Sequence, residues 1–393
     1  MKISAINLKI IQDSRGKDTL EASMVSGDFS VISSVPAGKS KGKLEAFSIA
    51  PAIALQKLEE IRSGILSSDF LGVLEFDNFL KKLDGTSDKS NLGGNLTLVL
   101  SICFTKLLAK SKNLQTYQLI GEMFGKVPQK FPYLYFNLIG GGLHAEDSLP
   151  FQEYILVAKF DSPVKGLECA KLTVEKLRED IVKNFGEVRT GDEGTFSIKS
   201  SDPALGLEVL KRNIDDQDVG LALDVAASTF YKNGEYEIDG KAFNTMQMLD
   251  FYQDLSAKFS LLSIEDPFSE DDKQGFVKIC EAFKNKIWVI GDDLTVTNRD
   301  LIQKAINEKQ ITGVIVKPNQ IGSVSETLDA IKLAQANNLK IIVSHRSGET
   351  NDDFIADLAF GAGAQGLKSG APTQPQRLAK YNRLIEIEGE VNK

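Results

Sequence analysis

Hydrophobic and polar residues alternate along the first 35 residues, in runs separated by turn-forming residues. The runs read ISAINLKII, TLEASMV and FSVISSV, with DSRGKD and SGD between them. This alternation is typical of a small antiparallel sheet. Longer segments of helical periodicity follow, ending with NLTLVLSICFTKLLAKSKN. A sheet followed by helices predicts an α+β domain over residues 1–130.

Short β-rich runs then recur, and each ends at a polar residue before a helical segment begins. The polar positions are Asp224, Glu265, Asp292, Lys317, His345 and Lys368, and all but the first step are 23 to 28 residues long. One strand, one helix and two short loops fill about 25 residues, so the spacing indicates parallel βα units. With YLYFNLI and QEYILVAKF, enough strands are present to close a barrel. We therefore predict an α/β fold with a (βα)8-like barrel over residues 131–393 and its chemistry at the strand ends.

A doubly wound open sheet is the competing architecture. Such a sheet usually carries a glycine-rich phosphate turn between its first strand and a helix. GGGLHAED follows YLYFNLI, but no helix clearly begins there. The barrel is therefore the preferred interpretation.

Charge and composition narrow the possible functions. The chain has 393 residues and a formal net charge of −8, which argues against a general nucleic-acid or membrane-surface binder. Lys9 and Asp13 interrupt the region where a signal peptide needs apolar residues, so we expect a cytoplasmic protein. Cys103, Cys169 and Cys280 are far apart in apolar or helical stretches, which favours reduced thiols over a disulfide or a zinc site.

Three carboxylates end successive predicted strands: Asp224, Glu265 and Asp292. The alternative is that each acid caps the helix that follows it. Three acids at corresponding strand ends weaken that alternative. Acidic oxygens without sulfur or several imidazoles favour a hard cation such as Mg²⁺.

Lysines and a histidine end the later strands. Lys317 follows the buried run GVIV, and a metal with a second lysine, Lys368, could lower its pKa into the range of a general base. Arg346 and Ser347 offer a fork and a hydroxyl suited to a phosphate or carboxylate. The alternative for His345 is a hydrogen-bonded core histidine.

Three further segments carry candidates. Glu193 lies in GDEGTF and Glu153 in FQEYILV, where helix entry is the alternative interpretation. The loop AGKSKGK does not match a P-loop, because that pattern requires glycine where the chain has Ser33. A lid that places Lys39 and Lys41 over an anionic substrate is more plausible.

These strings together resemble the enolase family over nearly the whole chain. The similar segments include QDSRG, FQEY, GDEGTF, LALDVAASTFY, SIEDPFSEDD, GDDLTVTN, SHRSGETNDD and GLKSGAP. The resemblance implies a capping domain followed by a barrel, and a lyase of glycolysis that interconverts 2-phospho-D-glycerate with phosphoenolpyruvate and water. It also implies two Mg²⁺ ions per site and a homodimer or a ring of dimers, with no nucleic-acid or membrane partner.

Position by position, the resemblance implies roles for individual residues. Asp224, Glu265 and Asp292 would bind the first Mg²⁺, and Ser40 of the lid would help to hold the second. Lys317 would be the base and Glu193 the acid. Glu153 would assist Glu193, and the remaining catalytic or substrate-contacting positions are His144, Gln152, His345, Arg346, Ser347 and Lys368.

Two alternative functions remain open from the sequence. The lid reads AGKSKG where the family usually has SGASTG, which leaves room for a catalytically weak relative retained for binding. A superfamily dehydratase or epimerase acting on a sugar acid is the second. The presence of Lys317 and Glu193 argues against the first, and the Arg346-Ser347 pair favours a small phosphorylated substrate over the second.

Overall fold

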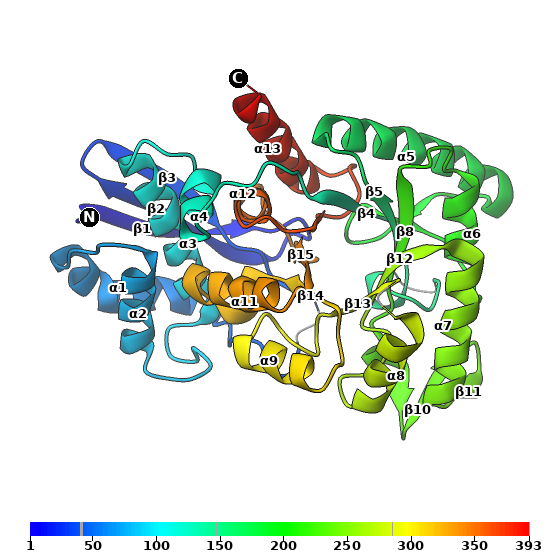
Figure 1. The fold of residues 1–393 in the computed structure, drawn as a ribbon. Coiled ribbons are helices and arrows are strands. Elements are labelled where there is room, and N and C mark those ends of the chain that lie inside the picture. Colours follow the sequence, from blue (N-terminus) through cyan, green and yellow to red (C-terminus); the bar gives the residue numbers. More distant parts are fainter. Residues whose placement is uncertain (40–41, 146–147, 285, 393) are drawn as a thin grey trace.

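Residues 1–39, 42–145, 148–284 and 286–392 are described by the computed structural model of the protein (Figure 1). The N-terminal part contains an antiparallel sheet with strand order β1-β2-β3. Its strands are β1 (Ala5–Gln12), β2 (Asp18–Ser26) and β3 (Phe29–Ser34). The helices that follow are α1 (Pro51–Ser67), α2 (Val73–Asp84), α3 (Gly94–Ser111) and α4 (Thr116–Met123).

Helix α3 is apolar on nearly every side because it lies between the sheet and the C-terminal part of the chain. It packs against β2 and β3. On another side, Thr97 donates a hydrogen bond to the Gly322 carbonyl at 2.8 Å, and Ser101 accepts one from the Val324 amide at 2.9 Å. Stacking of Phe104 on Phe76, with ring centroids 4.4 Å apart, links α3 to α2. The helix therefore fixes the N-terminal part against the rest of the molecule.

Eight strands of the described chain form a closed barrel, because the last of them, β16, pairs with the first, β4. These strands are β4 (Tyr133–Gly140), β5 (Glu153–Ala158), β8 (Val219–Asp224), β12 (Leu261–Glu265), β13 (Trp288–Gly291), β14 (Gly313–Val316), β15 (Lys340–Ser344) and β16 (Gly366–Lys368). The predicted barrel is thus confirmed, and the open sheet is excluded. An apolar cluster of β-strand residues, including Ile155, Ile290, Ile315 and Ile342, fills the interior of the barrel.

Helices surround the barrel (Figure 1). They are α5 (Pro163–Phe185), α6 (Leu205–Arg212), α7 (Thr245–Phe259), α8 (Lys273–Phe283), α9 (Arg299–Asn307), α11 (Val324–Ala336), α12 (Phe354–Gly361) and α13 (Pro375–Val391). Short elements fill the connections: η1 (Gly142–His144), β6 (Arg189–Thr190), β7 (Phe196–Ser197), η2 (Ala227–Phe230), β9 (Tyr231–Lys232), β10 (Glu235–Ile238), β11 (Lys241–Phe243) and α10 (Pro318–Ile321). None of the helices in the described ranges is both long enough and apolar enough for a membrane span.

Strand β5 departs from a uniform βα repeat. It runs antiparallel to both β4 and β8, whereas the other neighbouring barrel strands are parallel. The described residues of the connection between β4 and β5 form no α-helix, and a parallel crossover needs a longer connection. As a result the first residue of β5, Glu153, lies at the same mouth of the barrel as the last residue of β8, Asp224.

Candidate active site

The polar ends of the barrel strands face one cavity, which loops from the N-terminal part also line. Its lining includes these predicted residues: His144, Gln152, Glu153, Glu193, Asp224, Asp292, Lys317, His345, Arg346, Ser347 and Lys368. Glu265 is buried beside the cavity and contacts Lys368. Ser40 lies outside the described residues, so the structure does not place it. The structure therefore brings together the predicted residues that it describes.

Lys368 joins three carboxylates at the mouth of the barrel. Its Nζ lies 2.8 Å from Glu153 Oε2, 3.1 Å from Asp224 Oδ2 and 2.7 Å from Glu265 Oε2. Strand register produces this arrangement, because Asp224 is paired with Glu153 on one side and with Glu265 on the other. Burial opposes the charge of Lys368, but the carboxylates outweigh burial and raise its pKa well above the usual value.

The carboxylates at this mouth could hold a hard cation. Within the described ranges, Glu265 Oε1 is buried and has no hydrogen-bond partner. Burial raises the pKa of Glu265 well above its usual value. A buried carboxylate oxygen without a partner costs free energy, which a proton or a cation would offset. Because the donors are oxygens, the set suits Mg²⁺ better than a softer metal.

Asp292 follows β13 and holds Lys317. The Lys317 ammonium forms an ion pair with Asp292 Oδ2, and Gln320 Nε2 donates a hydrogen bond to Asp292 Oδ1 at 2.8 Å. Burial opposes the charge of Lys317, but Asp292 outweighs burial and raises its pKa. From the sequence, Asp292 was counted only as a metal ligand, so the lowered pKa that a metal and Lys368 together would give Lys317 stays a prediction for the metal-bound site.

Two further acids stand beside the predicted metal ligands. Asp266 accepts hydrogen bonds from the amides of Asp292 at 2.9 Å and Asp293 at 2.8 Å. One oxygen from each of these three residues lies within 4.8 Å of the others. Burial, reinforced by the charge of Asp292, raises the pKa of Asp293 to about 7. Asp266 and Asp293 were not identified from the sequence as candidate site residues, although each is adjacent in sequence to a predicted metal ligand.

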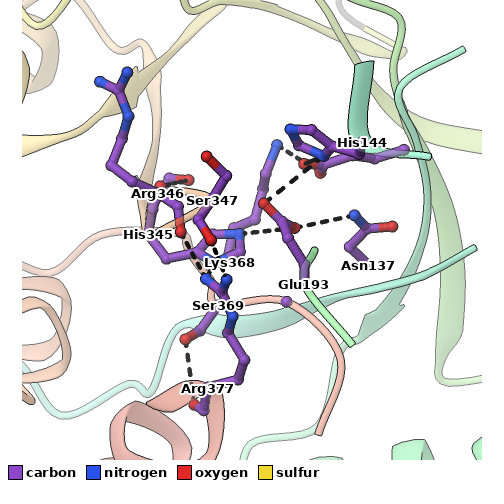
Figure 2. A network of polar contacts seen from close by, with 12 residues as sticks. Asn137, His144, Glu193, His345, Arg346, Ser347, Lys368, Ser369 and Arg377 are labelled. Carbon is purple, nitrogen blue, oxygen red and sulfur yellow. Dashed lines mark hydrogen bonds and ion pairs between the residues drawn. The ribbon is translucent and has the colours of Figure 1, made fainter. Parts of the chain in front are cut away.

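Glu193 and Glu153 meet around His144, as Figure 2 shows for His144 and Glu193. His144 Nδ1 lies 3.6 Å from Glu153 Oε1 and 3.8 Å from Glu193 Oε1. Burial raises the pKa of Glu153 to about 8. Burial also opposes ionisation of Glu193, but the imidazoles of His345 and His144 and the charge of Arg377 outweigh it and hold its pKa well below the usual range. The two carboxyl groups therefore differ in proton affinity, and Glu153 has the higher affinity.

His345 is held between Glu193 and a buried arginine of α13 (Figure 2). The Arg377 guanidinium contacts His345 Nδ1 and donates to the carbonyls of Arg346 and Ser347, each at 2.6 Å. A guanidinium has only donors, so Nδ1 must accept and the ring proton lies on Nε2, which is 3.4 Å from Glu193 Oε2. Burial keeps the pKa of His345 well below its usual value. Arg377 was not identified from the sequence, because what distinguishes this helix residue is its complete burial, which the sequence does not show.

Arg346 and Ser347 are engaged by the N-terminal part of the chain. Arg346 Nη1 lies 3.0 Å from Glu45 Oε2, and its Nη2 donates to Glu45 Oε1 at 3.1 Å. Ser347 Oγ accepts from the Lys39 amide at 2.8 Å and from Arg15 Nη1 at 3.2 Å. Glu45 was also missed, because its partner is 301 residues away in the sequence.

One lid lysine is described. Lys39 Nζ lies 3.0 Å from Asp192 Oδ2, next to Glu193 in the GDEGTF loop. Both side chains are partly exposed, so this ion pair contributes little stability. Lys41 lies outside the described residues, and its expected place over a substrate stays a prediction.

Comparisons with known proteins agree with this geometry. Residues 3–120 match the model of the enolase N-terminal domain, and residues 128–393 match that of the enolase C-terminal TIM barrel domain. The chain is 38% identical to an enolase of Sulfurisphaera tokodaii, over 97% of this chain and 94% of that protein. It is 38% identical to an enolase of Anaplasma marginale (100% and 95%) and 36% identical to one of Ehrlichia canis (99% and 97%). The resemblance drawn from the sequence is confirmed: the chain belongs to the enolase family.

Proposed function

We propose that this chain is a phosphopyruvate hydratase, a glycolytic lyase that interconverts 2-phospho-D-glycerate with phosphoenolpyruvate and water in the presence of Mg²⁺. The observation that carries the proposal is that Glu193, which is buried, and Lys317, whose side chain is 13% exposed, line the same cavity as Lys368, Asp224 and Asp292. A site for removing a proton next to a carboxylate needs a base, an acid and concentrated positive charge.

Asp224, Glu265 and Asp292 would hold the first Mg²⁺, and Ser40 would contribute to a second. Bound there, Mg²⁺ would supply charge that stabilises the extra negative charge on the substrate carboxylate. The orphaned Glu265 Oε1 supports this assignment. Lys368 would add its own charge from the same mouth.

Lys317 would abstract the proton from C2 of the substrate. A lysine does so only when neutral, and its ion pair with Asp292 opposes that state. Once Asp292 serves as a ligand, Lys317 loses part of this stabilisation, and burial then lowers its pKa toward the working range. The guanidinium of Arg346 and the ammonium group of Lys368 lower its pKa further.

Glu193 would donate a proton to the departing C3 hydroxyl. Glu153 has the higher proton affinity of the pair, and both carboxyl groups lie near His144. One oxygen of each carboxyl group lies within 4.8 Å of the other, so the two titrations are coupled, and Glu153 would pass a proton toward Glu193 as the substrate brings negative charge into the cavity. His345, through Nε2, would keep Glu193 oriented.

Arg346 and Ser347 would bind the substrate phosphate, with Gln152 and His144 contacting the rest of the substrate. Arg346 already forms a two-point contact with Glu45, so a phosphate would compete with that carboxylate for the guanidinium. We also propose that residues 1–130 act as the capping domain and residues 131–393 as the catalytic barrel. Lys39 and Glu45 support this division, since both reach the cavity from the first segment. By family analogy the enzyme would work in the cytoplasm as a homodimer or a ring of dimers.

Absorbance of phosphoenolpyruvate, formed from 2-phospho-D-glycerate with Mg²⁺ and again after chelation, tests the proposal. We expect Mg²⁺-dependent product, lost in Lys317→Ala and kept in Lys183→Ala, an exposed lysine of α5. Absence of product with Mg²⁺ in the folded wild-type protein would refute the proposal. Turnover of sugar acids instead would favour the superfamily dehydratase, and no turnover of either would favour the binding protein.

A further inference from the structure

A second cavity lies at the end of the barrel away from the active site. Tyr133, Trp288 and Lys340 line it, and each is the first residue of its strand (β4, β13 and β15). The active-site residues come at the opposite ends of such strands, as Asp292 does after β13. The cavity has a volume of about 550 Å³, within the range of small-molecule sites.

The walls of this cavity are packed in place. Phe131 is stacked on Phe360, with ring centroids 4.6 Å apart and planes 23° from parallel. Gln335 Nε2 donates a hydrogen bond to the Ala362 carbonyl at 2.6 Å, which ties α11 to the segment after α12. The side chain of Gln365 accepts a hydrogen bond from the Ile341 amide at 2.8 Å. The cavity is therefore preformed, and a ligand would not have to order it.

The chemistry of the lining is aromatic and basic. Phe131, Tyr133 and Trp288 present aromatic rings, and Lys126, Lys130 and Lys340 present ammonium groups. No aspartate or glutamate is among the lining residues that the structure describes. The Lys340 ammonium lies 5.3 Å from the Trp288 ring centroid. Over the same described ranges neither Lys126 nor Lys130 forms an ion pair, in a chain whose net charge is −8.

We propose that this cavity binds a nucleotide of the size of a nucleoside monophosphate. The base would contact the aromatic walls, because aromatic side chains can stack on any nucleobase. The phosphate would lie among the lysines, which attract it in an otherwise acidic protein. A ligand that is only apolar would leave the three ammonium groups without an anionic partner in the cavity, and a simple anion would leave the rings uncovered. The combination selects a ligand that is both aromatic and anionic.

Trp288 is the only tryptophan of the chain, so its fluorescence reports on this cavity directly. We would titrate the full-length protein with AMP and excite the indole where nucleobases do not absorb. Adenosine and inorganic phosphate serve as the two halves of the ligand. A saturable change with AMP, with each half at least about tenfold weaker, is the expected result.

Variants separate a built site from a general effect of charge. Lys126 and Lys130 lie on the loop before β4. The double variant Lys126→Gln/Lys130→Gln should weaken AMP binding by about tenfold or more. Lys183→Gln removes a positive charge from the exposed end of α5 and should leave binding unchanged. Formation of phosphoenolpyruvate by both variants would show that they are folded.

Three results would overturn the proposal. The first is no saturable response to AMP, and the second is phosphate alone binding as tightly as AMP. The third is a double lysine variant that binds AMP like the wild type. None of these outcomes bears on the hydratase activity, which has its own assay.

Discussion

Replacing Arg377 by lysine tests whether the active site depends on a buried guanidinium outside the barrel strands. Arg377 is fully buried and donates at 2.6 Å to the carbonyls of both Arg346 and Ser347, while it also contacts His345 Nδ1. An ammonium group keeps the charge but cannot reproduce the fork. At least one buried carbonyl and the imidazole nitrogen would lose their donor.

The expected cost can be worked from those contacts. Each buried acceptor left without a donor costs about 1–3 kcal/mol, so the loss of two donors in Arg377→Lys should lower the free energy of unfolding by about 2–6 kcal/mol. Without its donor, His345 can place its proton on Nδ1 and lose the Nε2 contact with Glu193. We expect kcat to fall by about 10- to 100-fold, as for partners that orient other catalytic groups.

Urea unfolding and the pH profile of kcat measure these two effects. Arg377→Met removes the charge as well, and that charge helps to hold down the pKa of Glu193. Its loss raises that pKa, so the limb of the profile set by Glu193 should move to higher pH in the methionine variant only. Arg212→Lys, at a partly exposed ion pair of α6 with Asp180, is the matched control and should change stability by under about 1 kcal/mol.

Native kcat and native stability in Arg377→Lys would refute this role of the guanidinium. A methionine variant whose pH profile matched that of the lysine variant would refute the electrostatic part alone. Loss of activity with an unchanged free energy of unfolding would contradict the stability cost worked out above and leave only the positioning of His345.

Three further predictions follow from the structure. Lys317→Ala should abolish exchange of the substrate C2 proton with solvent, whereas Glu193→Gln should retain that exchange and lose dehydration; equal loss in both would contradict separate roles. Asp292→Ala should reduce turnover severely at limiting Mg²⁺ with the fold kept by circular dichroism, and near-native activity there would show that Asp292 is not a ligand. Asp77, fully buried, accepts the Ser325 amide at 2.8 Å, and burial raises its pKa from 3.8 to about 6. The stability that its protonation contributes is present below pH 3.8 and is lost as the pH rises through 6, so Asp77→Asn should be more stable at pH 8 by up to about 3 kcal/mol and equal at pH 3. A difference independent of pH would contradict this origin.

The sequence predicted the residues that end the barrel strands, and the reason is local. Asp224, Glu265 and Asp292 each follow a short apolar run, and the recurring spacing indicates that these runs are parallel neighbours. Their side chains must then lie at one edge. The antiparallel direction of β5 was not predictable in this way, because the short connection between β4 and β5 breaks the period.

Residues that contact the site from outside the barrel strands have no comparable local pattern in the sequence. Glu45 meets Arg346 from 301 positions away, and Arg377 meets His345 from a helix outside the barrel. Neither lies at the end of a predicted strand. Glu193 and Glu153 were identified through the family resemblance rather than through periodicity, since each lies in a loop or at a strand start.

The direction of the Lys317 pKa shows where sequence reasoning needs coordinates. From the chain alone, a second lysine and a metal argue for a lowered pKa, and the acids are counted only as ligands. In the structure the acids also hold lysines: Asp292 pairs with Lys317, and Lys368 contacts Asp224 and Glu265. The same carboxylates therefore pair with lysines and offer oxygens to a metal ion. Lys317 can become a neutral base only when Asp292 also binds the cation. Base strength and ligand binding are thus coupled at this mouth, because one carboxylate cannot stabilise both charges fully.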